Sequence, residues 1–183
     1  MRRLACILTS ALALCGAATP GWTAPRSYVQ GPVVLIDYGV ICQVLSNGSR
    51  PAPETLLGEI NLIDRTRDMD VTTRVVPARA GISFGVKFTG APGTGALPVT
   101  VIVTHPPMGE AGIARESWTA LVEEGDSGLS LFTFEFPYEM LPGPWSMAIE
   151  ADGRRLMEQH FQVVPELAAP GVLSVCDRQD FVS

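Results

Sequence analysis

The chain has 183 residues, 46% hydrophobic and 17% charged, and its formal net charge is −6. It contains one lysine, Lys87, and its only basic pair outside the N-terminus is Arg154-Arg155. Nucleic acids and anionic lipids are bound through Lys and Arg that neutralise phosphates, so an acidic chain of this kind is not expected to bind either.

The first 24 residues have the layout of a secretory signal peptide. Two arginines precede an apolar run over 4–18, and Pro20 and Gly21 follow it. The run of about fifteen residues is shorter than the ~20 that span a bilayer. We therefore expect a leader cleaved near 18–24, export across the inner membrane to the periplasm, and no membrane-spanning segment.

Lipid anchoring at Cys15 is the alternative processing route. It is not expected, because Leu14 stands where a lipobox has a small residue. Removing the leader with its two arginines leaves 11 basic and 19 acidic residues, a net charge near −8. The remaining chain of about 160 residues is the size of one domain with its own core.

Two cysteines, Cys42 and Cys176, remain after the leader. In an oxidising compartment two such residues most simply form one disulfide, although two separate buried thiols are the alternative. The bridge would fold the C-terminal tail, 165–183, back onto the first strand. In the chain-entropy model a loop of this length stabilises the fold by at most roughly 5 kcal/mol.

Hydrophobic residues alternate with a period of two along most of the chain, which is the strand pattern. The clearest runs, in chain order, are 33–45, 83–88, 99–105 and 131–136. Segments rich in Gly, Pro, Asn and Asp separate them, as in an antiparallel sandwich or barrel. The predicted domain covers 33–164.

Other segments are less regular. We expect residues 54–63 to form a strand rather than a helix, because Gly58 interrupts them and Ile60 alternates with Leu62. Pro106-Pro107 should end the strand over 99–105. No segment indicates a long helix, and single helical turns are expected at most near 110–116 and 165–169.

The last hairpin joins strands 145–150 and 155–164. A two-residue turn at Asp152-Gly153 would place the apolar residues of the second strand on the wrong face. We therefore predict a three-residue loop over 151–153, with Gly153 left-handed. This register places two sets of side chains on opposite faces: Trp145, Met147, Ile149, Met157, Phe161 and Val163 inside, and Glu158, His160 and Gln162 outside.

The tetrapeptide Gly125-Asp126-Ser127-Gly128 matches the surroundings of the nucleophile in chymotrypsin-like proteases. A catalytic triad also needs a histidine base held by a buried carboxylate. His105 precedes Ser127 by only 22 residues, and His160 follows it on the predicted outer face. We interpret Ser127 as a loop residue in a turn between strands.

The two histidines are also the candidates for a metal site. A copper carrier could use His105 and Met108, because imidazole and thioether are copper ligands. The alternative is a histidine that caps the strand end through nearby backbone groups, and the absence of any His-x-His or Met-x-Met cluster favours it. We expect no metal site and no cofactor.

Two tryptophans are candidates for ligand contacts. Trp145 belongs to the inward-facing stripe of its strand and is interpreted as a core residue. Trp118, within "ARESWTAL", is less constrained by the pattern. Trp118 and His105 are therefore the residues at which we expect a small-ligand contact, if there is one.

Four segments, "DYGVIC" (37–42), "THPPMG" (104–109), "FEFPYEMLPGPW" (134–145) and "DGRRLMEQHFQVV" (152–164), resemble the bacterial family catalogued as domain of unknown function 3859. The likeness is closest to its exported members, which share a first-strand cysteine and a late one. The resemblance implies an immunoglobulin-like sandwich and transfers no catalytic residue.

Together these observations predict an exported, all-β, immunoglobulin-like antiparallel β-sandwich of seven to nine strands that is not an enzyme. The leading functional hypothesis is a binding or structural module of the cell envelope. It would act through loops or an edge strand on an envelope protein or a glycan. The alternative is the periplasmic copper-type carrier using His105 and Met108.

Overall fold

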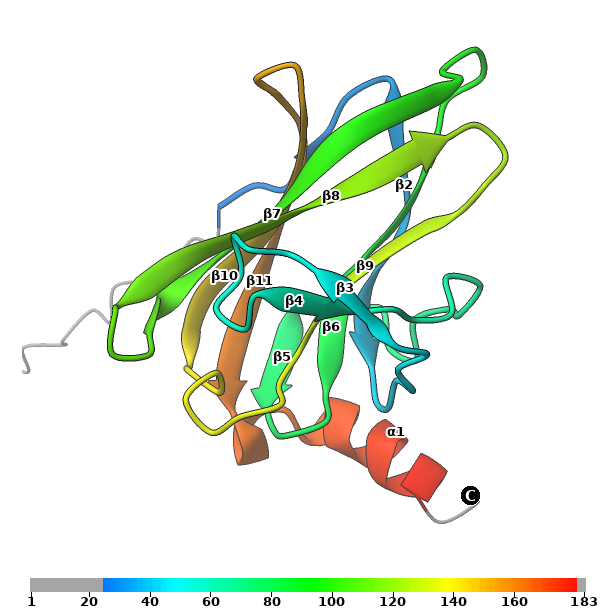
Figure 1. Cartoon of the computed structure of the whole chain (residues 1–183). Helices are drawn as coiled ribbons and strands as arrows, with labels where there is room; N and C mark the ends of the chain where they lie inside the picture. Colours follow the sequence, from blue (N-terminus) through cyan, green and yellow to red (C-terminus); the bar gives the residue numbers. More distant parts are fainter. Residues whose placement is uncertain (1–24, 181–183) are drawn as a thin grey trace, which may run out of the picture.

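The computed structural model describes residues 25–180, so the signal peptide predicted over 1–24 lies outside the described residues. The described chain folds into two facing β-sheets, a small hairpin and a C-terminal helix (Figure 1). The strands are β1 (Tyr28–Val29), β2 (Val33–Ile41), β3 (Ser49–Pro51), β4 (Glu59–Asn61), β5 (Val75–Ala78), β6 (Ser83–Gly90), β7 (Ala96–Met108), β8 (Ile113–Glu123), β9 (Gly128–Thr133), β10 (Gly143–Ala151) and β11 (Arg154–Pro165).

The larger sheet has six strands in the order β1-β11-β10-β7-β8, with β5 also paired to β11. The smaller sheet has the order β2-β6-β9, and β3 pairs only with β4. All pairs are antiparallel except β5–β11. The all-β sandwich is thus confirmed, and the strands beyond the expected seven to nine are short ones such as β1, β3 and β4.

The core lies between the two sheets and follows the alternation of the sequence. Phe84, Val86 and Phe88 of β6 are buried, as are the inward residues of β7, β10 and β11. Trp145 is fully buried at its centre, with its ring centroid 5.5 Å from that of Phe84, and its Nε1–H donates to the Leu141 carbonyl. The interpretation of Trp145 as a core residue is confirmed.

Helix α1 (Pro170–Asp180) occupies the tail that the sequence analysis left without regular structure. Proline is favoured at the first helical position, and Val172 and Cys176 are buried one helical turn apart. Its apolar residues, Val172, Leu173, Val175 and Cys176, lie within five consecutive positions, which is too short a stretch to show a helical period. The 3-10 helix η1 (Glu166–Ala168) precedes it, within the turn expected at 165–169.

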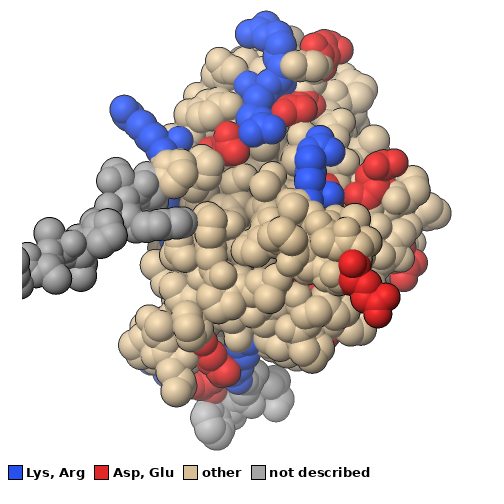
Figure 2. Space-filling view, turned by 90° about the vertical axis from the view of Figure 1, so that its left-hand side faces the viewer, with Lys and Arg blue, Asp and Glu red and all other residues tan. Residues whose placement is uncertain are grey.

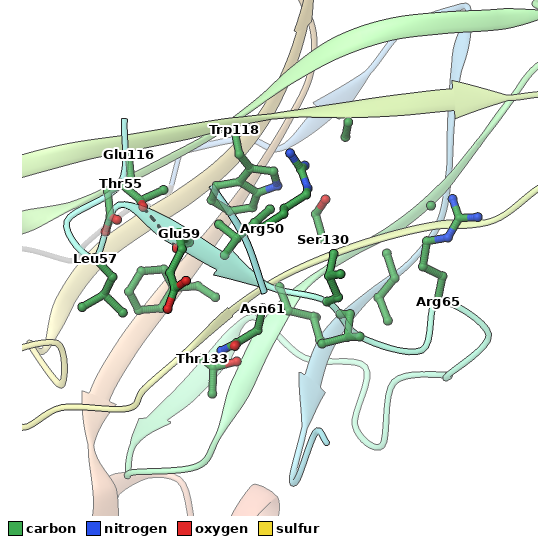
Figure 3. A pocket seen from close by; sticks show the side chains of 18 of the residues that line it. Arg50, Thr55, Leu57, Glu59, Asn61, Arg65, Glu116, Trp118, Ser130 and Thr133 are labelled. Carbon is green, nitrogen blue, oxygen red and sulfur yellow. Dashed lines mark hydrogen bonds between the residues drawn. The ribbon is translucent and has the colours of Figure 1, made fainter. Parts of the chain in front are cut away.

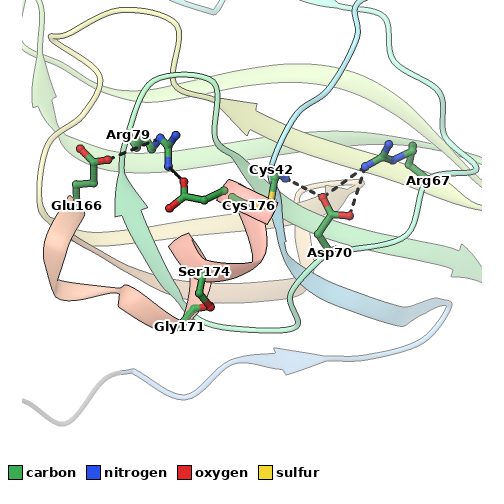
Figure 4. The surroundings of a disulfide bond; sticks show 9 residues. Cys42, Arg67, Asp70, Arg79, Glu166, Gly171, Ser174 and Cys176 are labelled. Atoms are coloured by element: carbon green, nitrogen blue, oxygen red, sulfur yellow. Dashed lines mark hydrogen bonds and ion pairs between the residues drawn. A yellow bond between two sulfur atoms is a disulfide. The ribbon is translucent and has the colours of Figure 1, made fainter. Parts of the chain in front are cut away.

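The predicted disulfide between Cys42 and Cys176 is confirmed (Figure 4). It joins the residue that follows β2 to the second half of α1. The Cys42 amide donates to Asp70 Oδ2 at 2.8 Å, and Arg79 contacts Asp177 of the helix at 2.5 Å. No helix among the described residues is both long and apolar enough to span a membrane.

The three-residue loop predicted over 151–153 in the last hairpin was wrong. Ala151 pairs with Arg154, so the turn has the two residues Asp152 and Gly153, both with positive φ. The extra residue lies further along β11, where the register shifts between Ile149 and Glu150. This bulge brings Met157, Phe161 and Val163 to the core face, as predicted, while Glu158, His160 and Gln162 are half-buried on the opposite face.

Two strand ends also differ from expectation. β7 continues through Pro106-Pro107 to Met108, because these prolines lie beyond its pairing with β10 and within an irregularity of its pairing with β8. Proline lacks a backbone N–H, but at these two positions no regular ladder hydrogen bond is required of it. β9 ends at Thr133, so Phe134 is buried but Phe136 is 40% exposed rather than on a strand face.

Candidate functional site

A hollow of about 340 Å³ lies where the sandwich opens between β8 and β9. These strands are the adjacent edges of the two sheets. Residues 49–61, which form β3, β4 and the turns between them, contribute to its lining and run below β8 in Figure 1; we call this segment the flap. The volume is within the range of small-molecule sites.

The flap is tied to the sandwich by backbone and side-chain hydrogen bonds. The Ser117 amide donates to the Glu54 carbonyl at 3.0 Å, and the Arg50 guanidinium donates to the Thr119 carbonyl. Asn61 Nδ2 donates to Glu135 Oε1 at 2.6 Å. The hollow is therefore enclosed by a segment held at both of its strands.

The wall of the hollow combines apolar and polar side chains, with the apolar ones slightly more numerous. Trp118 and Ala120 project from β8, and side chains of β6, β9 and the flap complete it (Figure 3). The apolar lining includes Leu57, Ile60, Phe88, Leu129, Leu131 and Phe132. Trp118 is half-buried and packs against the core, so one part of its indole faces the hollow.

Four carboxylates line the same hollow: Glu59, Glu116, Glu135 and Glu139. Glu139 is buried, and its Oε2 accepts hydrogen bonds from the amides of Glu135 at 2.6 Å and Phe136 at 2.9 Å. Burial raises the pKa of Glu139 despite these two bonds, and the negative charges of Glu135 and Glu116 raise it further.

Glu116 connects the flap to the core. Its Oε2 accepts the Leu56 amide of the flap at 2.7 Å, and its Oε1 lies 3.3 Å from His105 Nε2. His105 is buried, and its Nδ1 lies 2.9 Å from the Pro106 carbonyl oxygen. Because a carbonyl can only accept, Nδ1 carries a proton; Nε2 faces the Glu116 carboxylate without hydrogen-bonding geometry.

The structure brings together two of the residues singled out in the sequence. Glu116 and Trp118 lie two residues apart on the inward face of β8, so Trp118 lines the hollow and His105 lies behind Glu116. A ligand contact at Trp118 or His105 stays a prediction. The buried Glu116 was missed, although the alternation in "ARESWTAL" places it in phase with Trp118.

The geometry gives no support to the copper-type carrier. His105 contacts Pro106 and Glu116, Met108 is buried in the core, and His160 lies on β11, where its backbone amide donates to Ser27. Among the described residues, no three His, Cys, Asp or Glu side chains form a group that could hold a metal ion.

Ser127 lies in the connection between β8 and β9, as interpreted from the sequence. Its neighbour Asp126 pairs with Arg65 at 3.0 Å, at the surface. The polar contacts of the His105 ring are to Pro106 and Glu116, not to Ser127. On the molecular face shown in Figure 2, basic side chains are interspersed with acidic ones rather than forming a basic strip.

Comparisons with known proteins place the chain in a family. An immunoglobulin-like protein from Pseudomonas aeruginosa of known crystal structure matches with a TM-score of 0.47 and 19% identity, over 78% of this chain and 100% of that one. No curated protein matches. A family model described as a domain of unknown function (DUF3859) matches residues 31–163. The chain therefore belongs to the DUF3859 family, as its four sequence motifs indicated.

Proposed function

We propose that this domain is an exported, non-enzymatic binding module of the cell envelope, and that it takes its ligand into the hollow beneath the flap. The observation that carries the proposal is the hollow itself: about 340 Å³, lined by Trp118 and other apolar side chains together with four carboxylates and two arginines. Concave, mostly apolar sites with a few placed polar groups are the usual form of small-molecule sites.

Export is supported by the signal-peptide layout of the sequence and by the disulfide. Cystines persist in oxidising compartments such as the periplasm, and the one between Cys42 and Cys176 pins the C-terminal helix to the sandwich. Periplasmic location is tested by fractionating cells that express the tagged full chain. Recovery of the tagged chain with the cytosolic markers would contradict it.

Binding through an edge strand receives less support than binding in the hollow. At the β2 edge, the Tyr38 amide is occupied by the Asp37 side chain and the Val40 amide by the Val71 carbonyl. At the β8 edge, the flap occupies Ser117 and Thr119. Side chains and loops that occupy edge groups in this way oppose the addition of a partner strand.

A non-catalytic role is supported by the positions of the candidate catalytic groups. Ser127 is in a loop, and His105 lies in the core with its Nδ1 engaged by a backbone carbonyl. A nucleophilic mechanism needs serine and base within hydrogen-bond reach of each other. Turnover of esterase, peptidase or glycosidase substrates that is lost in Ser127→Ala would contradict this part of the proposal.

The site is tested with a chemically mixed fragment library, observed through the indole N–H resonance of Trp118. We expect several fragments to shift this resonance and to lose binding in Ala120→Phe, in which the larger side chain fills the hollow. Ala111→Phe, in the exposed turn between β7 and β8, is the matched control and should retain binding. Fragments that bind Ala120→Phe unchanged would show that the hollow is not the site.

A further inference from the structure

We propose that the ligand of the hollow is a small organic cation, an amine carried on an apolar or aromatic body. This inference rests on the proposed function, since it names the class of ligand that the same site takes. It is carried by the charges that line the hollow, by the partners those charges have and by the aromatic side chains beside them.

The carboxylates of the hollow lack the cations that usually balance such groups. Glu59 Oε2 accepts the Ser49 hydroxyl, Glu135 accepts the Asn61 amide, and Glu139 accepts two backbone amides. In the ion pairs formed by residues 25–178, none of the four carboxylates is paired with Lys or Arg. Because these donors are neutral, they do not neutralise the negative charge of the carboxylates.

Two arginines also line the hollow, but they do not cancel its charge. Arg65 pairs with Asp126, and in Figure 3 it lies at the opposite end from Glu59 and Glu116. Arg50 lies beside the Trp118 indole and donates to Thr119. The end of the hollow that holds the glutamates therefore keeps a negative potential, which a low-dielectric wall strengthens.

His105 lies behind the same end of the hollow, next to Glu116. Its side chain is fully buried, and Nε2 points at Glu116 Oε1 from 3.3 Å without forming a hydrogen bond. It approaches the hollow from the core side and reaches only Glu116 of the four carboxylates. The protein thus supplies one imidazole behind the site and leaves the space in front of the glutamates for a cation from solution.

The negative charges of these glutamates also affect the pKa values of two neighbouring groups. The pKa of Tyr138 is raised, first by desolvation and then by the charges of Glu139, Glu116 and Glu135. The pKa of Glu139 is raised by burial and by the other two glutamates. A bound cation would stabilise the ionised forms of both groups and so lower both pKa values. The same attraction would stabilise the bound ligand at this end of the hollow.

Aromatic groups suited to an organic cation stand beside the carboxylates. Trp118 lines the hollow, and tryptophan is the best partner for cation–π contacts. Phe136 and Tyr138 form an exposed stack with ring centroids 5.4 Å apart, next in sequence to Glu135 and Glu139. An apolar body would fill the space lined by Leu57 and Phe132 while its ammonium group faces the glutamates.

Three probes of matched shape test the class of ligand: 3-phenylpropylamine, 3-phenylpropanol and 3-phenylpropionate. They are titrated into the ¹⁵N-labelled exported protein while the Trp118 indole resonance is followed, with assignment by Trp118→Phe. We expect the amine to bind about tenfold more tightly than the alcohol, and the carboxylate to bind most weakly. The resonance of the fully buried Trp145 serves as the internal reference.

The outcomes separate the two proposals. Binding of the alcohol or the carboxylate as tightly as the amine would overturn the cation while leaving the hollow as the site. The absence of any Trp118 shift with all three probes would overturn the cation and the hollow together. Only a preference for the amine supports the inference.

A pair of variants distinguishes local charge from net charge. Glu59→Gln removes one carboxylate of the hollow, whereas Glu110→Gln removes one from the exposed turn between β7 and β8. We expect Glu59→Gln to weaken the amine about three- to tenfold without changing the alcohol, and Glu110→Gln to change neither. Equal weakening of the amine by both variants would show that overall charge, not the site, attracts it.

Discussion

The only lysine of the chain is a buried structural residue rather than a surface charge. Lys87 extends from the outer face of β6, and its Nζ donates to the carbonyls of Thr66 and Arg67 at 3.2 and 3.0 Å. It also contacts Asp68 Oδ1 at 2.6 Å. A charged donor shared among three acceptors fixes the loop 64–70 over the smaller sheet.

Replacing this lysine should cost stability although it lies far from the hollow. Lys87→Met keeps the apolar stem but leaves the Thr66 and Arg67 carbonyls without their donor. We expect the free energy of unfolding to fall by about 1–3 kcal/mol in urea denaturation. Arg154→Met, which removes an exposed charge near the hairpin turn, should change it by less than about 0.5 kcal/mol. Equal effects would show that net charge, not the contacts of Lys87, is responsible.

Glu139 gives the protein a pH dependence whose sign can be stated. Burial raises its pKa in the folded state above the ordinary value of 4.5, so the folded protein holds this proton more tightly than the unfolded chain. The ionised group therefore costs stability at neutral pH, and that cost disappears as the pH falls through the raised pKa. Below about pH 4.5 both states are protonated and the cost is gone.

The variant Glu139→Gln isolates this cost. A glutamine oxygen can still accept the amides of Glu135 and Phe136, but it carries no charge. We expect the variant to be more stable than the parent protein at pH 7 and equal to it near pH 4. The measurement is urea denaturation across this range, with Glu110→Gln as a control that should follow the parent. A constant difference at every pH would show that shape rather than charge is decisive.

Single residues show where the sequence pattern was sufficient and where it was not. Two-residue alternation placed Phe84, Val86 and Trp145 correctly, because each lies in a strand paired on both sides and its side chain faces the core. It failed for Phe136, which follows the end of β9 and is exposed. Glu116 was overlooked because the strand pattern identifies inward positions by their hydrophobic residues, and a carboxylate is not one of them.

At the scale of elements, the pairing of β6 with β9 depends on a close approach that only glycine allows. A Cβ on Gly85 would lie 2.0 Å from the Ser130 carbonyl oxygen of β9. Since that neighbour is backbone, it cannot move aside without disturbing the ladder. The wall of the hollow includes Leu129, Ser130 and Leu131, so this close pairing also positions one side of the candidate site.

Gly85→Ala should therefore destabilise the fold by about 3 kcal/mol or more, measured by urea denaturation. Gly171→Ala is the matched control, because an added Cβ there meets nothing within 4 Å and alanine is favoured in helix α1. We expect Gly171→Ala to be neutral or up to about 1 kcal/mol stabilising. A near-neutral Gly85→Ala would show that β9 can move away from β6 without loss.

The elements missed by sequence analysis are those stabilised mainly by tertiary contacts. β3 was not expected, and of the strand expected over 54–63 only the three residues of β4 form. The flap is held by hydrogen bonds to Ser117, Thr119 and Glu135. The bulge in the last hairpin was inferred correctly from the conflict of faces. Its place in β11 was not, because several positions restore the same alternation.

At the scale of the whole molecule, the two ends of the domain are joined by one covalent link. Cys42 follows the edge strand β2, and Cys176 lies in α1, 134 residues later. Among the described side chains, this C-terminal segment is also tied by the burial of Ala169 and Val172 and by the partly exposed contacts of Arg79 with Glu166 of η1 and Asp177 of α1. Exposed ion pairs contribute little, so the disulfide and the buried face hold α1.

Removing the disulfide should therefore lower stability substantially and loosen α1 before the sheets. For a loop of this length the chain-entropy model gives about 5 kcal/mol as an upper value, and we expect Cys42→Ala/Cys176→Ala to lose about 3–5 kcal/mol in urea. Hydrogen exchange should show faster exchange of the α1 amides, while the β10–β11 amides stay protected. The parent protein in reductant should match the variant, and the variant should not respond to reductant. Unchanged stability of the parent on reduction would mean that burial of Val172 and Ala169 alone fixes the helix.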